Sequence, residues 1–346
     1  EIITSDWSSD VCSSDLTLIE MAKKNVAVVM GGYSDEYKVS LRSGELIFES
    51  LDRNLYNVFK VVILKDEWYF LDDDGSKLPI NKADFSVSRG EKILKFDVCF
   101  NTIHGKPGEN GELQAYWDTI GQRYTGCNFY QSALTFNKKD TLAVLSKYGI
   151  PSAKSIYIRK GEKVDAEKII SELSLPLFVK PNQSGSSLGI SKVKDISDFD
   201  KALDFAFAED DEVLIESFLD GTEVSVGVID YKGKTTVLGI TEIVPKNEFF
   251  DYEAKYEGAS EEITPARLDD ETRQKVEDIA KRAYESLGMS GFSRSEYIIM
   301  NGTPYLLEMN TNPGFSPASI LPQQARHYGM SITDLCGNEV EKALNK

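Results

Sequence analysis

Residues 293–314 read SRSEYIIMNGTPYLLEMNTNPG, two largely apolar strands around an Asn-Gly pair, and the interpretation of the whole chain rests on the polar residues among them. Strand residues two apart point to the same face. A three-residue turn over 300–302, with Gly302 left-handed, would put four polar residues on one face, whereas a two-residue Asn-Gly turn would split them. We predict the three-residue turn. The four residues are Arg294, Glu296, Glu308 and Asn310.

Such a face would join two carboxylates to an amide oxygen. These are hard ligands, and they suit Mg²⁺, which takes few protein oxygens and completes its shell with phosphate and water. A solvated strand face with ordinary ion pairs would have the same residues. The hairpin alone leaves both alternatives open, so the rest of the chain must decide between them.

Length and charge limit the possible classes of protein. The chain has 346 residues, so two or three domains are expected, and a net charge of −17 disfavours binding to nucleic acid or to an anionic membrane. No stretch approaches the ~20 apolar residues of a membrane span. We therefore expect a soluble cytoplasmic protein with no nucleic-acid or membrane partner.

The cysteines argue against zinc or a disulfide framework. They are Cys12, Cys99, Cys127 and Cys336, none forms a C-x-x-C pair, and the chain has only two histidines. Residues 1–20 contain an imperfect Ser-Ser-Asp repeat and lack the basic start and apolar core of a signal peptide. We expect 1–20 to be a non-native or disordered leader, with Met21 as the natural start.

From residue 23 the pattern alternates between strands and helices. Apolar runs at 25–30, 58–64 and 96–101, with a helix before about Leu51, predict an open parallel α/β sheet domain over 21–127. A helix at 132–147, strands at 177–181 and 190–193 and a helix at 196–209 predict a central domain over 128–215. A C-terminal domain over 216–346 would hold antiparallel strands, a helix at 269–287 and the hairpin. The long polar and aromatic stretch 246–266 is typical of a lid loop.

Several segments could carry chemistry. The sequence KPNQSGSSLG at 180–189 follows a strand, and a lysine before a Gly/Ser loop favours phosphate binding over a flexible hairpin. Lys138 lies at a helix start, where a solvated face is the alternative. The strand at 213–219 could bind an adenine edge and Glu223 ribose hydroxyls, or the strand could simply cross between domains. His104 and Glu36 each follow a strand and could face a ligand cleft.

Six ordered motifs resemble the D-alanine–D-alanine ligase family of the ATP-grasp superfamily, over essentially the whole chain from Met21. They are GGYSDEYKVSL, HGKPGENG, KPNQSGSSLG, EVLIESFLDGTEVSV, DYEAKY and YLLEMNTNPGF. The resemblance implies an α/β N-terminal domain followed by the two-domain α+β ATP-grasp fold. It also implies that ATP is spent to join two D-alanines through an acyl phosphate, in the synthesis of peptidoglycan precursors, and that the enzyme is a homodimer.

The resemblance also implies site residues. Phosphate binding would fall to Lys138 and Lys180, and adenine and ribose binding to Glu216, Leu219 and Glu223. Further ATP-binding residues would be Ser187, Ser217 and Lys255. Metal ligands would be Glu296, Glu308 and Asn310, for two Mg²⁺ ions or Mn²⁺. The oxyanion would be stabilised by Arg294 and the Gly314 N–H, with Ser319 at the carboxylate of the second substrate. The ammonium group of the first substrate would lie at Glu36, near His104, in a triad of Glu36 with Ser186 and Tyr256.

The chain departs from the family pattern at three positions. Lys38 stands where many members have Glu, Ser217 where many have Lys, and Glu296 where many have Asp. The side chain of Glu296 is longer than that of Asp, which changes its reach to a metal. Three alternative functions are a D-alanine–D-lactate ligase, against which Tyr256 argues, another ATP-grasp carboxylate–amine ligase, and a nucleotide-binding regulator without catalysis. The intact metal and phosphate residues argue against the regulator.

Overall fold

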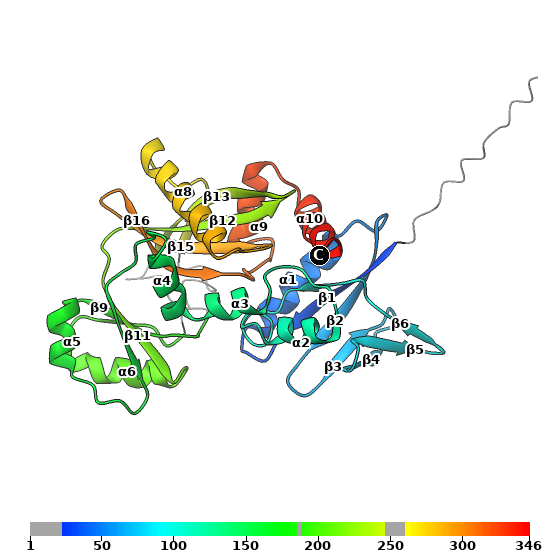
Figure 1. The fold of residues 1–346 in the computed structure, drawn as a ribbon, viewed down its shortest axis with the longest axis horizontal. Coiled ribbons are helices and arrows are strands. Elements are labelled where there is room, and N and C mark those ends of the chain that lie inside the picture. Colours follow the sequence, from blue (N-terminus) through cyan, green and yellow to red (C-terminus); the bar gives the residue numbers. More distant parts are fainter. Residues whose placement is uncertain (1–22, 186–187, 246–259) are drawn as a thin grey trace, which may run out of the picture.

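The computed structural model describes residues 23–185, 188–245 and 260–346, in which three β-sheets with their helices lie side by side (Figure 1). The three sheets have seven, four and five strands and follow one another along the chain. Within the described residues, no helix is long and apolar enough to span a bilayer. The predicted α/β fold class is confirmed.

The first sheet has the strand order β6-β5-β4-β3-β2-β1-β7. The predicted parallel strands are present, with β1 paired between β2 and β7. Their continuous apolar runs suit strands that are covered on both faces. Four short antiparallel strands, which the sequence analysis left unassigned, extend the sheet, so it is mixed rather than purely parallel. The elements are β1 (Lys24–Gly31), α1 (Tyr37–Ser50), β2 (Tyr56–Ile63), β3 (Trp68–Leu71), β4 (Lys77–Asn81), β5 (Ser86–Arg89), β6 (Lys92–Leu94), β7 (Val98–Asn101) and α2 (Glu112–Ile120).

The second unit contains a difference from prediction. The single helix expected over 132–147 is two helices, α3 (Phe129–Phe136) and α4 (Lys138–Ser146), separated at Asn137. Asn137 is extended, with φ −93° and ψ 102°, and its side chain accepts the Asp140 N–H, so it caps α4. The sheet has the order β10-β9-β11-β8. Its elements are β8 (Ser155–Arg159), α5 (Ala166–Leu173), β9 (Leu177–Pro181), β10 (Ser191–Val193), α6 (Phe199–Phe207) and β11 (Glu212–Ser217).

The third sheet has the order β14-β13-β12-β15-β16. Its elements are β12 (Thr222–Tyr231), β13 (Lys234–Pro245), β14 (Ser260–Ile263), α8 (Asp270–Ser286), β15 (Ser293–Met300), β16 (Thr303–Asn310), α9 (Ile320–Tyr328) and α10 (Ile332–Leu344). Strand β14 falls within the stretch 246–266 predicted as a lid loop, and residues 246–259 of that stretch lie outside the described residues.

The predicted three-residue turn of the charged hairpin is wrong, but the four polar side chains still lie on one face of the hairpin, as predicted. Asn301 and Gly302 both have positive φ, 52° and 73°, which is a two-residue turn. From there Tyr297 pairs with Leu306, but the next pair is Glu296 with Glu308, so Leu307 is an extra residue in the second strand. This β-bulge shifts the register by one residue. It therefore returns the four polar side chains to one face.

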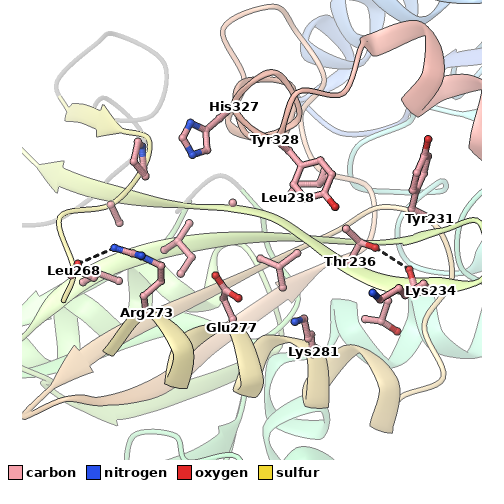
Figure 2. Close-up of a pocket in the computed structure, with 16 residues that line it drawn as sticks. Tyr231, Lys234, Thr236, Leu238, Leu268, Arg273, Glu277, Lys281, His327 and Tyr328 are labelled. Atoms are coloured by element: carbon pink, nitrogen blue, oxygen red, sulfur yellow. Dashed lines mark hydrogen bonds between the residues drawn. The ribbon is translucent and has the colours of Figure 1, made fainter. Parts of the chain in front are cut away.

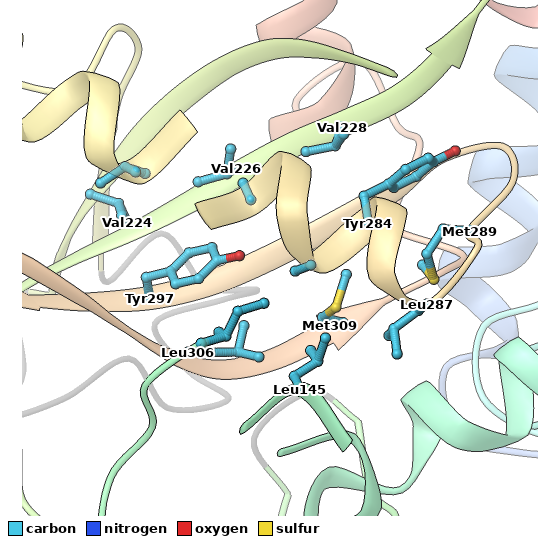
Figure 3. Packing of buried hydrophobic residues seen from close by; sticks show 14 of the residues in the cluster. Leu145, Val224, Val226, Val228, Tyr284, Leu287, Met289, Tyr297, Leu306 and Met309 are labelled. Atoms are coloured by element: carbon cyan, nitrogen blue, oxygen red, sulfur yellow. The ribbon is translucent and has the colours of Figure 1, made fainter. Parts of the chain in front are cut away.

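Two cores cross the predicted domain boundaries. Leu142 and Leu145 of α4 lie in one buried cluster with Tyr297, Leu306 and Met309, so α4 packs on the third sheet (Figure 3). The C-terminal helices pack against the first sheet, with the buried side chains of Leu321 and Val340 in one cluster with Val28 and Phe100. The first core thus joins α4 of the second unit to the third sheet, and the second core joins the first sheet to the C-terminal helices.

Candidate active site

A pocket of about 420 Å³ lies between the second and third sheets. It gathers eight of the residues that the sequence analysis assigned to ATP or metal, from strands and helices far apart in the chain. They are Lys138, Lys180, Glu216, Ser217, Leu219, Glu223, Glu296 and Glu308. Phe178, Ile298 and Leu307 add apolar walls, so the pocket has both a place for a flat base and a charged end.

The two predicted phosphate lysines lie at that charged end, and both are buried. Lys180, at the end of β9, forms an ion pair with Glu216 of the neighbouring β11. The Lys138 Nζ donates to the Ser184 carbonyl at 2.8 Å and lies 3.0 Å from the Glu308 carboxylate. Burial alone would lower the pKa of Lys138, but the Glu308 carboxylate outweighs it and the pKa is raised. Lys138 is therefore a cation in this site.

Asn182, which the sequence analysis did not single out, holds Lys138 and Lys180 in register. It is fully buried, its side-chain oxygen accepts the Lys139 N–H at 2.9 Å, and its main-chain oxygen accepts the Lys138 N–H at 3.3 Å. Its amide group donates to Glu212 at 3.1 Å. One residue thus ties the start of the Gly/Ser loop to the N-terminus of α4. In the sequence, only the position of Asn182 two residues after Lys180 could have indicated this supporting role.

The hairpin carboxylates form the candidate metal site. Glu296 and Glu308 are directly paired across β15 and β16, and Asn310 pairs with Arg294. The Arg294 guanidinium donates to Glu296 at 2.8 Å, and the Asn310 side-chain oxygen accepts the Asn312 N–H at 2.8 Å. Two carboxylates and an amide oxygen suit Mg²⁺. The described residues contain no group of three or more His, Cys, Asp or Glu side chains placed to hold a metal.

Glu36, from the loop after β1, faces the Gly/Ser loop of the second sheet. A Cβ atom added to Gly185 would lie 2.9 Å from Glu36 Oε2, and one added to Gly105 would lie 3.1 Å from it. The carboxylate is therefore enclosed by two glycines that leave no room for side chains. Four predicted residues of this region lie outside the described residues, and their roles stay predictions. They are Ser186, Ser187, Lys255 and Tyr256.

His104 is buried, and protein groups occupy both ring nitrogens. Nδ1 lies 2.8 Å from the Asn312 carbonyl and Nε2 lies 2.9 Å from the Ser43 hydroxyl, which also accepts the Phe315 N–H. Burial lowers the pKa of His104, so the neutral ring donates through Nδ1 and accepts through Nε2. His104 thus joins the first sheet to the loop after β16. Its predicted contact with substrate stays a prediction.

The same loop brings Gly314 and Ser319 together. A Cβ atom added to Gly314 would lie 3.3 Å from the Ser319 hydroxyl, which accepts the Ser316 N–H at 2.9 Å. Ser319 is also the residue before α9. An N–H group and a hydroxyl therefore lie side by side near the hairpin that carries Arg294.

Glu109 is a second residue that the sequence analysis missed, although it lies in the quoted motif HGKPGENG. Its carboxylate accepts the Gly105 N–H at 2.8 Å. Burial, followed by the charge of Glu36, raises the pKa of Glu109 to about 8. A protonated Glu109 would leave Glu36 as the charged carboxylate of this corner.

Comparison with known proteins places the chain among ligases. Family models described as D-ala D-ala ligase N-terminus and C-terminus match residues 25–127 and 144–341. D-alanine–D-alanine ligases of Flavobacterium psychrophilum and Flavobacterium johnsoniae are 62% and 56% identical over 322 residues, which is 93% of this chain and 98% and 99% of theirs.

Solved structures agree with this placement. The VanG D-Ala:D-Ser ligase of Enterococcus faecalis has a TM-score of 0.84 at 32% identity, over 93% of this chain and 99% of that one. The D-alanine–D-alanine ligase of Bacillus anthracis complexed with ATP has a TM-score of 0.74 at 27% identity, over 93% and 98% of the two chains.

Proposed function

The chain belongs to the D-alanine–D-alanine ligase family, and from that premise we propose how its residues divide the work of joining two D-alanines at the expense of ATP. The activity is that of the family, and it serves peptidoglycan precursor synthesis. One observation carries the assignment of residues. A single pocket joins both buried lysines, the acidic residues of β11 and β12, and the hairpin carboxylates.

We assign the pocket to ATP. The adenine would lie against Phe178 and Leu219 and hydrogen-bond to the main chain of 216–219, with the ribose hydroxyls at Glu223. Ser217 leaves these main-chain contacts possible. Lys138 and Lys180 would face the phosphates, where fixed positive charge is needed because phosphoryl transfer depends on positioning and charge neutralisation.

Glu296, Glu308 and Asn310 would hold Mg²⁺, and two ions fit the resemblance. When bound, Mg²⁺ supplies charge neutralisation to the phosphate oxygens. In the described structure Lys138 and Arg294 neutralise the same two carboxylates. With these carboxylates engaged as metal ligands, Lys138 would be available to the phosphates and Arg294 to the oxyanion.

The two amino acids would bind where the first and third sheets meet. Glu36 would hold the ammonium group of the first D-alanine, whose carboxylate attacks the γ-phosphorus and displaces ADP, giving an acyl phosphate. The neutral amine of the second D-alanine then attacks the carbonyl carbon. Arg294 and the Gly314 N–H would stabilise the tetrahedral oxyanion until phosphate leaves, and Ser319 would hold the second carboxylate.

Phosphate release from ATP tests this function with D-alanine, L-alanine, D-lactate and D-serine supplied singly and in pairs. Release with D-alanine alone, together with formation of the dipeptide, is expected. A requirement for D-lactate or D-serine as the second substrate would move the chain to a related ligase. The absence of release with every substrate would contradict the assignment.

We also propose that the enzyme is a cytoplasmic homodimer, as the family resemblance implies. Its substrate ATP and its acidic surface are consistent with that compartment. Sedimentation equilibrium of the purified chain measures the mass directly, and a mass of one chain at micromolar concentration would contradict the dimer.

A further inference from the structure

A second cavity, of about 720 Å³, lies along β13 between α8 and α9 and shares no lining residue with the ATP pocket (Figure 2). Helix α8 forms one wall with Arg273, Glu277 and Lys281, and the end of α9 forms the other with His327 and Tyr328. The proposed function does not use this cavity. Its volume suits a small organic ligand.

The cavity is positively charged on a strongly acidic protein. Lys234, Arg273 and Lys281 face a single carboxylate, Glu277, whereas the whole chain has a net charge of −17. Among the described residues, Lys234 and Lys281 have no ion pair, and the carboxylate partner of Arg273 is Asp270, whose side chain is 95% exposed. Positive charge that local acids do not neutralise attracts an anion.

The remaining lining suits a flat ring. Tyr231 and Tyr328 present aromatic rings, and Leu238 and Leu268 are apolar (Figure 2). Tyr328 is 51% exposed, so its ring is accessible to a ligand. In the described residues the outer edge of β13 pairs with β14 only from Glu242 to Pro245, so residues 234–239 have no strand partner there. Because the inner edge of this stretch pairs with β12, about every second N–H points outward, and those groups add donors for an anion.

A short segment connects this cavity to the ATP pocket. Pro265, Ala266 and Leu268 line the cavity, whereas Arg267 between them lines the ATP pocket. The Arg267 guanidinium donates to both oxygens of Glu242, at 2.9 and 2.6 Å, and Glu242 also lines the ATP pocket. Residues 265–268 are therefore a wall with one pocket on each side.

Arg273 connects the cavity to that wall. Its guanidinium donates to the Leu268 carbonyl at 3.3 Å (Figure 2). An anion that took this donor would deprive the Leu268 carbonyl of its hydrogen bond, and Leu268 is bonded directly to Arg267. The contacts from Arg273 through Leu268 and Arg267 reach Glu242, which lines the ATP pocket.

We propose that this cavity is a second ligand site, for a ring-bearing organic anion of about mononucleotide size, and that its occupancy changes the affinity for ATP. The coupling part rests on the proposed assignment of the first pocket to ATP, whereas the binding part does not. Because coupling is reciprocal, ATP changes the affinity for the anion by the same factor.

The probe is 8-anilinonaphthalene-1-sulfonate, a fluorescent aryl anion, titrated into the full chain with the ATP pocket filled by Mg·ADP. We expect saturable binding of one probe per chain. Arg273→Gln/Lys281→Gln should weaken binding at least tenfold. The matched control is Lys275→Gln/Arg282→Gln, which removes two cations of α8 that do not line the cavity, and its affinity should stay within twofold of the original.

Two results would overturn the binding part: no one-to-one binding in the presence of Mg·ADP, or equal affinity in both double variants. The coupling part is measured separately, as the KM for ATP with and without saturating probe. A change of at least twofold that disappears in Arg273→Gln/Lys281→Gln is expected. An unchanged KM overturns the coupling, and inactivity without probe would instead count against the proposed function.

Discussion

The Lys138 ammonium lies 3.0 Å from the Glu308 carboxylate, so a predicted phosphate ligand and a predicted metal ligand neutralise each other. Each side chain is thereby held near its working position. In the proposed mechanism Lys138 would exchange the Glu308 carboxylate for a phosphate, and Glu308 would exchange the Lys138 ammonium for Mg²⁺, so that each group would keep a partner of the same charge sign. Little reorganisation is then needed at the moment of reaction.

Glu308→Gln should abolish turnover more than ATP binding. The amide keeps the size of the side chain but removes a charge from the metal site and leaves the buried Lys138 without its carboxylate. We expect kcat to fall by about 100-fold or more, because loss of even an outer partner of a metal ligand costs 10–100-fold. Phosphate release is measured over a range of Mg²⁺ concentrations, with ATP affinity from calorimetry. Near-normal turnover at modest Mg²⁺ would count against the metal assignment.

Asn182→Leu should raise the KM for ATP about tenfold, with a smaller effect on kcat, because the two phosphate lysines lose their common support. Asn137→Ala is the matched control. It also removes one side-chain acceptor from a first-turn N–H of α4, at a cost of about 1 kcal/mol in stability. Its KM for ATP should stay nearly unchanged. Equal KM changes in the two variants would show that Asn182 acts only on the helix.

Gly185→Ala should weaken binding of the first D-alanine. The new methyl group would lie 2.9 Å from Glu36 Oε2 and must displace that carboxylate. A displacement of this kind can cost roughly tenfold or more in kcat/KM for D-alanine. Gly337→Ala in α10 is the control, since a Cβ there meets no atom within 4 Å. If Gly185→Ala leaves the D-alanine kinetics unchanged, Glu36 is not the ammonium ligand.

Glu339→Gln should stabilise the protein at pH 8 and not at pH 5. Glu339 is buried in α10, and burial raises its pKa from 4.5 to about 7. Between those values the folded state keeps a proton that the unfolded state has lost, so stability falls as pH rises through this window. The glutamine amide does not titrate, so the variant should avoid this fall in folding free energy, which is on the order of 1–3 kcal/mol. Thermal melts of both proteins at several pH values test it, and parallel curves would contradict it.

The sequence alone was sufficient for the family and for many of the elements, although not for the short strands β3 to β6 or for the break between α3 and α4. Apolar runs at β1, β2 and β7 and the alternation along β15 and β16 are local patterns, because side-chain direction in a strand repeats every two residues. The motifs around Lys180, Glu216 and Glu308 are also local. Their order along the chain sufficed to place these residues in one pocket, where the structure has them.

The hairpin shows where local pattern fails. Asn301-Gly302 adopts the two-residue turn that its own chemistry favours, and the bulge at Leu307 then restores the polar face. That register places Tyr297 and Leu306 in the core beside Leu145 of α4. The benefit of burying these side chains therefore depends on a helix about 150 residues earlier in the chain, which no turn rule contains.

The support of the site is equally non-local. His104 hydrogen-bonds to a carbonyl 208 residues away in the chain. The backbone N–H of Lys138 donates to the Asn182 carbonyl, and its ammonium group donates to the Ser184 carbonyl and pairs with the Glu308 carboxylate. Residue types and spacing specify which groups can bind phosphate, metal and substrate. Which of them neutralise, cap or orient one another follows from packing of the three sheets, because hydrogen bonds and ion pairs act over a few ångströms in space, whatever the distance along the chain.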